Sequence, residues 1–283
     1  MHSRDVLSAI RKSLPGAACA MGLALIPGTA QAQSLGDKYW VELSGFWPDV
    51  NSTVQVNSKA HPSIGTTIDL ESDLDLADRK VLPSVNAGAR FGHWVIGAEY
   101  YSLHREGSRS IARDITFDDV TYHAGVNVAT GFDSDIYRLT VGYNFIHNAT
   151  QELGVAIGGH VTDFDVSLKG QATLSGSPVV SSQLRSHTVL APLPTIGAYG
   201  GIEAIPHLWI GARVDWLSLK VGDYKGRLWN AQIEANYRIM KNVGLGVMYR
   251  YVDYRLEVDK DAWSGTMTYR FNGPAVVLRI GFK

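Results

Sequence analysis

The chain has 283 residues, of which 26 are Lys or Arg and 27 are Asp or Glu, and its formal net charge at pH 7 is −1. This balance argues against nucleic acid as a partner, because no basic surface of the required strength is available. The composition is even along the chain and includes no Pro/Ser-rich linker, so we expect one large domain after any leader segment.

Residues 1–32 have the features of a cleaved secretory signal peptide. Arg4, Arg11 and Lys12 make a basic start, an apolar run covers 17–26, and Ala30-Gln31-Ala32 supplies small residues for cleavage after Ala32. We therefore predict export through the inner membrane and a mature domain of residues 33–283.

The predicted mature chain has 23 basic and 26 acidic residues and no cysteine, because Cys19 lies in the signal segment. The absence of cysteine suits an exported bacterial protein. No apolar run of about 18 residues remains after cleavage, so we expect no membrane-spanning helix.

From residue 38 onward, apolar and polar side chains alternate with the period of a β-strand. In the clearest segment, one face begins with Trp229 and ends with Tyr237, and the opposite face includes Gln232 and Glu234. Pro192 makes one strand less regular, because proline cannot donate a ladder hydrogen bond. The predicted strands are 38–47, 81–91, 94–101, 137–145, 153–162, 190–199, 208–216, 229–237, 243–251 and 276–282.

The connections between these strands alternate between short and long. The short turns, at 92–93, 147–150, 206–207 and 241–242, fall at one end together with both termini. The long polar segments, at 49–80, 105–131, 169–186 and 259–266, fall at the other end. Short periplasmic turns and long extracellular loops are typical of outer-membrane barrels. Alternation on both sides of Asp118-Asp119 also predicts a hairpin within the second long segment.

Three strands have an aromatic residue at each end of the apolar face, eight residues apart. Eight residues rise roughly 20 Å along a barrel axis at about 3.3 Å per residue and a tilt near 40°. This approximates the apolar band of an outer-membrane barrel. The alternative is a soluble β-sandwich with the apolar face as its core. The predicted lipid-interface aromatics are Tyr39, Trp47, Tyr137, Phe145, Trp229 and Tyr237.

The opposite face carries charges of both signs, which a closed barrel would turn inward. An unpartnered buried charge costs about 3–5 kcal/mol, so we expect these side chains to pair. About ten strands leave little room for a water-filled channel, which needs about sixteen. The predicted lumen ion-pair network comprises Glu42, Arg90, Glu99, Arg138, Arg213, Asp215, Glu234, Arg238, Arg250 and Arg279.

The pattern resembles the small outer-membrane β-barrels of Gram-negative bacteria, such as the OmpA transmembrane domain and OmpW-like proteins. The resemblance rests on the cleavage site, the two-residue repeat over 33–283 and the closing strand PAVVLRIGF. It implies an all-β fold: a single antiparallel up-and-down transmembrane barrel of about ten strands, with eight or twelve as alternatives. Such barrels usually end in an aromatic residue, whereas here Phe282 is followed by Lys283.

The same resemblance implies location in the outer membrane and contact with outer-membrane lipid and lipopolysaccharide. It also implies recognition by the outer-membrane insertion machinery, and we expect a monomer.

An acidic stretch in the first long segment contains oxygen ligands of the kind that Ca²⁺ and Mg²⁺ prefer. The metal candidates are Asp69, Glu71, Asp73 and Asp75. The stretch lacks the glycine and the terminal glutamate of a calcium-binding EF-hand loop. We therefore favour a solvated loop facing the lipopolysaccharide cation layer, and we predict no metal and no cofactor.

The histidines give no catalytic arrangement. His160 lies on an inward face, but strand parity points Asp163 away from it. No serine stands at a telling spacing from His160, and His104, His123 and His187 lie near predicted loops without evident partners. We therefore expect no catalytic residue and no enzyme.

These observations favour a non-enzymatic barrel with a plugged lumen, contributing to envelope structure or surface interaction. The alternatives are a narrow channel for a small or apolar solute, and an outer-membrane enzyme that processes lipid or peptide.

Overall fold

The computed structural model describes residues 36–59, 65–174 and 180–283, and the predicted signal peptide lies outside these residues. The strands belong to one compact unit, 31–283. Within the described part of the chain, no helix is long and apolar enough to cross a membrane.

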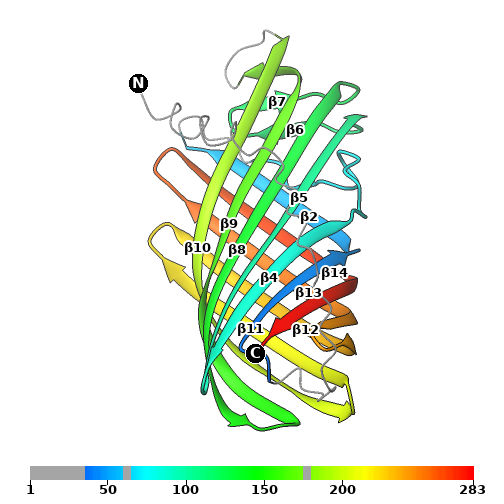
Figure 1. The fold of residues 1–283 in the computed structure, drawn as a ribbon. Coiled ribbons are helices and arrows are strands. Elements are labelled where there is room, and N and C mark those ends of the chain that lie inside the picture. Colours follow the sequence, from blue (N-terminus) through cyan, green and yellow to red (C-terminus); the bar gives the residue numbers. More distant parts are fainter. Residues whose placement is uncertain (1–35, 60–64, 175–179) are drawn as a thin grey trace, which may run out of the picture. The chain divides into compact units, whose positions relative to one another are not determined.

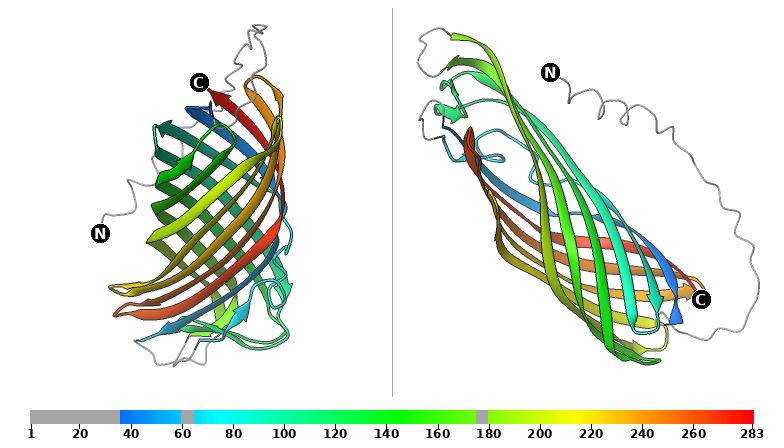
Figure 2. Two further views of the ribbon diagram at one scale, coloured as in Figure 1. Left: turned by 90° about the horizontal axis from the view of Figure 1, so that it is seen from below. Right: turned by 90° about the vertical axis from the view of Figure 1, so that its left-hand side faces the viewer.

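The described residues form an antiparallel all-β sheet, and ten of its strands close into a ring (Figures 1 and 2). The ring order is β1-β4-β5-β8-β9-β10-β11-β12-β13-β14, and β14 pairs with β1. The predicted ten-stranded barrel is confirmed. The ring strands are β1 (Tyr39–Phe46), β4 (Leu82–Phe91), β5 (Trp94–Ser110), β8 (Asn127–His147), β9 (Gln151–Leu174), β10 (Val180–Ile205), β11 (Leu208–Val221), β12 (Tyr224–Met240), β13 (Val243–Asp259) and β14 (Trp263–Phe282). The additional strands are β2 (Asp49–Ser58), β3 (Ile68–Asp69), β6 (Ile115–Phe117) and β7 (Val120–Tyr122).

The strands extend well beyond the predicted segments at their outer ends, so three of the predicted long loops are wrong. Residues 105–110 belong to β5 and 127–131 to β8, and most of 169–186 belongs to β9 and β10. Only residues 260–262 separate β13 from β14. Figure 1 shows β9 and β10 reaching far toward the end that carries β6 and β7.

The physical reason is that the alternation inverts along each long strand. In the part of β13 next to the short turn, 243–251, the side chains on the barrel exterior are apolar, and Val247 is 61% exposed. Beyond Tyr251 the outer face becomes polar, starting with Asp253, while the inner face becomes apolar and includes Tyr254, which is 2% exposed. The strand therefore has a lower zone with an apolar exterior and an upper zone with an apolar interior. We call these the membrane zone and the outer zone.

The outer zone has a packed core of its own. Phe132, Tyr269 and Phe271 face inward, and the ring centroids of Phe132 and Tyr269 lie 5.7 Å apart. The predicted hairpin around Asp118-Asp119 is confirmed: β6 pairs with β7, and Asp118 takes a positive φ of 59° in the turn. Phe117 of this hairpin is fully buried.

β3 and the segment after it close the same end of the barrel. Ile68, Leu70 and Leu74 have no exposed surface, so this part of the predicted loop 49–80 is core and not a solvated loop. Burial of three aliphatic side chains contributes about 1.5–3 kcal/mol each to holding the segment in place.

β1 and β2 act as two halves of one strand against β14. β14 pairs with β1 from Ala275 to Phe282 and with β2 from Trp263 to Asn272. Gly273 lies at the break, where a β-carbon would come within 2.3 Å of the Trp47 carbonyl oxygen. Glycine is required there because the two backbones approach so closely.

The two prolines of β10 limit its pairing on one side only. β10 pairs with β9 through Pro192 and Pro194, but it pairs with β11 only from Ile196 onward. Proline has no N–H to donate, which accounts for the ladder toward β11 ending at this point.

Candidate functional site

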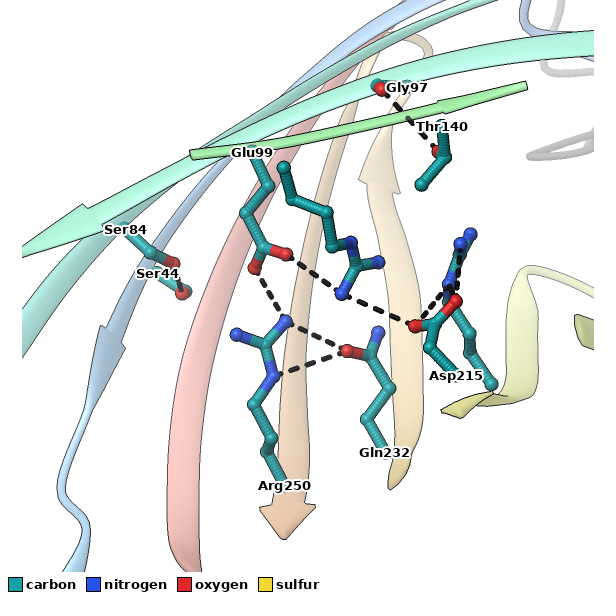
Figure 3. Close-up of polar contacts among 10 residues, drawn as sticks. Ser44, Ser84, Gly97, Glu99, Thr140, Asp215, Gln232 and Arg250 are labelled. Atoms are coloured by element: carbon teal, nitrogen blue, oxygen red, sulfur yellow. Dashed lines mark hydrogen bonds and ion pairs between the residues drawn. The ribbon is translucent and has the colours of Figure 1, made fainter. Parts of the chain in front are cut away.

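The centre of the membrane zone is a buried cluster of charges around Glu99 of β5. Its Oε2 lies 3.1 Å from Arg138 Nη1, and its Oε1 accepts a hydrogen bond of 2.5 Å from Arg250 Nη2. All three residues are at most 6% exposed. Figure 3 shows Glu99 and Arg250 reaching toward each other from different strands. Inward-facing positions on β5, β8 and β13 thus meet at one level of the lumen.

Asp215 and Gln232 extend this cluster across the barrel (Figure 3). Asp215 lies 3.4 Å from Arg138 and 2.8 Å from Arg213. Gln232 Oε1 accepts hydrogen bonds of 3.2 and 2.8 Å from Arg250. Three arginines therefore share two carboxylates in this cluster, which leaves one net positive charge.

Three further ion pairs lie nearer the short-turn end. Arg279 pairs with Glu42 at 2.6 Å, Arg90 with Glu152 at 2.5 Å, and Arg238 with Asp37 at 2.7 Å. These pairs, with the cluster around Glu99, bring together every residue of the predicted lumen network except Glu234.

Glu234 lines a polar cavity of about 130 Å³ together with Glu42 and Arg279. Within the described residues, no ion pair connects it to a basic partner. Its proximity to Glu42 and Arg279 still places it in the charged part of the lumen.

The sequence reasoning missed Asp37 and Glu152. Glu152 has the same parity as the inward residues Ala156 and His160, and extending the β9 pattern by two positions would have found it. Asp37 precedes the first alternating segment, and no sequence pattern pointed to it.

The outer zone closes the lumen above the charged cluster. His160 is 2% exposed and stacks on Tyr254 with ring centroids 6.1 Å apart. Tyr101 and Tyr254 belong to the apolar core that continues toward the loops. His160 is therefore a lumen residue at the boundary between the charged cluster and the core.

The predicted interface aromatics all lie on the outer face. Their exposed fractions range from 45% to 53%. Strand direction puts Tyr39, Phe145 and Tyr237 near the short-turn end, and Trp47, Tyr137 and Trp229 near the outer zone. Trp47 lies just after β1 and not within it.

The acidic candidates of the first long segment are engaged by arginine and by backbone groups. Glu71 pairs with the buried Arg105 and accepts a hydrogen bond of 2.6 Å from Ser52 Oγ. Asp73 pairs with Arg113 at 2.6 Å. Asp69 accepts the Ser72 N–H at 2.7 Å, and Asp75 lies 4.0 Å from Arg109. In the described ranges, no three His, Cys, Asp or Glu side chains are grouped so as to hold a metal ion.

The Arg113 contact has an electrostatic consequence. The hydrogen bond from Arg113 to Asp73 raises the pKa of the guanidinium above its ordinary value. This pair ties the segment after β3 to the connection between β5 and β6.

The loop histidines do have partners, which corrects the sequence-based expectation. His187 Nε2 lies 3.2 Å from an Asp118 carboxylate oxygen. His123 Nδ1 lies 3.1 Å from Asp114 Oδ2. The expectation failed because these residues belong to strands or to their ends, where neighbouring chains fix the side chains.

His104 has the most organised surroundings of the three. Its Nε2 lies 2.9 Å from Ser102 Oγ, and its Nδ1 lies 2.8 Å from Asp133 Oδ1. Ser102 and His104 are two apart on β5, and His104 is the register partner of Asp133 on β8.

Comparison with known proteins supports the fold. No family model matches the chain, and no curated protein matches it in sequence. Among solved structures, the outer membrane protease OmpT from Escherichia coli aligns with a TM-score of 0.57 at 11% identity, covering 89% of this chain and 99% of that one. This similarity shows a shared outer-membrane β-barrel fold.

Two other solved structures align less well. The Pseudomonas putida toluene transporter TodX has a TM-score of 0.32 at 9% identity, covering 87% of this chain and 90% of that one. Neisserial surface protein A has a TM-score of 0.27 at 11% identity, covering 87% and 97%. We draw nothing further from these two.

Proposed function

We propose that this chain is an integral outer-membrane barrel that does not conduct ions and that contributes to envelope structure or surface interaction. The observation that carries the proposal is the filled interior. Charged side chains occupy the membrane zone around Glu99, and the apolar core around Phe132 and Tyr254 occupies the outer zone.

The exterior supports the location. In the membrane zone the outer face is a continuous band of apolar side chains, which would be costly in water but stable against acyl chains. In the outer zone the exterior of β13 is polar from Asp253 to Asp259, as expected for a part that projects into water. The surface available for interaction is therefore the exterior of the outer zone with the β6–β7 hairpin.

Because of this apolar exterior, we propose outer-membrane lipid and lipopolysaccharide as the surroundings of the barrel. We also propose the outer-membrane insertion machinery as the assembly partner. It would recognise the closing strand, with Phe282 as the aromatic signal before Lys283. The barrel closes on itself through β1 and β14, so a monomer completes the ring without a strand from a second copy.

Conductance in planar lipid bilayers tests the proposal against the channel alternative. The purified barrel should show no steady conductance above the bare bilayer. Arg250→Ala removes a side chain from the charged cluster, and Val252→Ala trims the core directly above it as a matched control on the same strand face. A steady wild-type conductance that changes in Arg250→Ala and not in Val252→Ala would overturn the proposal in favour of transport.

A further inference from the structure

A serine, a histidine and an aspartate form a continuous hydrogen-bonded chain on the outer face of the barrel. Ser102 Oγ lies 2.9 Å from His104 Nε2, and His104 Nδ1 lies 2.8 Å from Asp133 Oδ1. The ionised carboxylate can only accept, so Nδ1 of the neutral ring carries the proton and Nε2 is free to accept the Ser102 hydroxyl proton. This is the order of groups that activates a serine nucleophile.

The sheet holds the three groups in place. Ser102 and His104 share one face of β5 because they are two residues apart. Asp133 is the direct register partner of His104 across the β5–β8 ladder, and side chains of such pairs have β-carbons about 4.5–5.5 Å apart. All three side chains lie at the surface, so a substrate in the surrounding medium can reach them.

The chain of groups lies at the upper edge of the apolar band. Tyr100, two residues before Ser102, stacks with Tyr137 at 5.0 Å between ring centroids and donates its hydroxyl to Asp135 at 3.1 Å. Tyrosines with an apolar ring and a bonded hydroxyl mark the membrane–water boundary. Ser102 and His104 then lie roughly 5 and 10 Å above Tyr100, at about 2.5 Å of rise per residue. That is the depth at which ester bonds join acyl chains to lipid headgroups.

A surface hollow runs along the apolar band below this point. It has a volume of about 580 Å³, and its walls include Tyr100, Tyr137 and Leu139. Its floor is made of small residues, among them Ala98 and Gly159, and a β-carbon at Gly159 would meet no atom within 4 Å. An acyl chain lying in this hollow would bring its ester end to the level of Ser102.

We propose that Ser102, His104 and Asp133 form an esterase site that hydrolyses acyl esters of lipids in the outer leaflet. This adds an activity to the proposed non-conducting barrel and departs from the expectation that the protein is not an enzyme. Ser102 is the nucleophile, His104 is the general base and acid, and Asp133 is a positioning residue that holds the ring.

The reaction is a hydrolysis in two balanced steps. His104 Nε2 takes the Ser102 proton as Oγ attacks the ester carbonyl carbon, and it returns that proton to the alcohol oxygen as the C–O bond breaks. Water then gives a proton to Nε2 as it attacks the acyl-Ser102 carbonyl carbon, and Nε2 passes that proton to Ser102 Oγ as the C–Oγ bond breaks, which releases the fatty acid and restores the serine. Lys80 donates from its Nζ to the His104 carbonyl oxygen, so a positive charge lies next to this residue.

Fatty acid release tests the proposal. Folded protein in detergent micelles is incubated with phospholipid vesicles in one arm and with purified lipopolysaccharide in the other, and free fatty acids are measured by mass spectrometry. We expect release in at least one arm. Ser102→Ala and His104→Gln should each lower the rate about 100-fold or more, and the arm that responds identifies the source of the ester.

A matched control is available on β11. Ser218 lies on the outer face two residues after Trp216, as Ser102 follows Tyr100. Ser218→Ala should leave the rate unchanged. The heat-dependent gel shift of each variant confirms that the barrel is folded.

The pH profile of the rate tests whether Asp133 positions the His104 ring, because a purely structural role would leave that profile unchanged. Asp133→Asn should lower the rate and change its pH profile, because an amide can hold the wrong ring tautomer, and Asp133→Glu should restore part of the rate. Release from neither lipid, or equal release by wild type and Ser102→Ala, would overturn the esterase site. Neither result bears on conductance, so the non-conducting barrel is tested separately.

Discussion

Replacing Glu99 by Gln tests whether the charged cluster holds the membrane zone together. The carboxylate of Glu99 contacts Arg138 at 3.1 Å and Arg250 at 2.5 Å. The substitution keeps the size of the side chain and removes one of the two negative charges that balance three arginines. Arg138 retains Asp215 at 3.4 Å, whereas the contacts left to Arg250 are with two neutral groups, Gln232 and the Tyr101 ring.

The expected cost follows from leaving a buried charge without its counter-ion. An ion pair at about 4 Å is worth roughly 4 kcal/mol at an effective dielectric constant near 20, and the carboxylate's own desolvation penalty offsets part of the loss of two such contacts. Breaking a buried pair on one side costs about 3–5 kcal/mol. We therefore expect Glu99→Gln to lower the free energy of unfolding by about that amount.

The assay is urea unfolding in phospholipid vesicles, followed by tryptophan fluorescence, as a double-mutant cycle with Arg250→Met. The double variant should be more stable than Glu99→Gln alone, because the unpaired cation is gone. A loss below about 1 kcal/mol in Glu99→Gln, with no coupling between the two sites, would refute the reasoning.

Three further outcomes are expected. Val247→Arg should cost about 2–4 kcal/mol in the same unfolding assay, because it puts a charge against lipid near mid-membrane; no penalty would contradict the assigned lipid face. Gln232→Glu, beside Arg250 in the lumen, should insert as well as wild type in a gel-shift assay, whereas failed insertion would mean that the cluster carries no spare positive charge. The hydrogen bond from the Ala124 N–H lowers the pKa of Asp114 from 3.8, so its stabilising contribution is present above pH 4 and is lost as the pH falls through the lowered pKa. Hydrogen exchange at Ala124 should therefore rise on acidification in wild type and be insensitive to pH in Asp114→Asn, after correction for intrinsic rates.

The sequence predicted the barrel because the membrane zone obeys a single rule along every strand. Outer residues such as Val247 and Ile233 are apolar, and inner residues such as Arg250 are polar. This two-residue period located the ring strands, the lumen charges and the interface aromatics without any knowledge of the pairing.

The outer zone was not predicted because its strands have the reverse pattern, with apolar residues on the inside of the barrel. In 169–186, outer residues such as Lys169, Gln171 and Ser182 are polar, and the segment was interpreted as a loop although β9 continues with Ala172 inside the core. Polar residues on the outside of a water-exposed barrel look like loop residues when the inner face is not recognised. An inversion of the alternating pattern at the interface tyrosines would have been the signal.

The Ser102 arrangement was missed for a related reason. His104 was assigned to a loop, so its parity with Ser102 was not considered. Its contact with Asp133 depends on the register between β5 and β8, and a single sequence does not specify which residues face each other across two strands joined by a long connection.

A cysteine scan along β13 tests the central claim most directly, because Cys19 is the only cysteine in the chain and lies in the predicted signal peptide. Spin labels at 245, 247 and 249 in vesicles should be accessible to oxygen and protected from a water-soluble relaxation agent. Labels at 253, 255 and 257 should show the opposite behaviour, and a label at 252 should be protected from both agents. Water accessibility at 247, or an exterior that does not change character between 251 and 253, would contradict a barrel with its lower exterior in lipid and its upper interior packed.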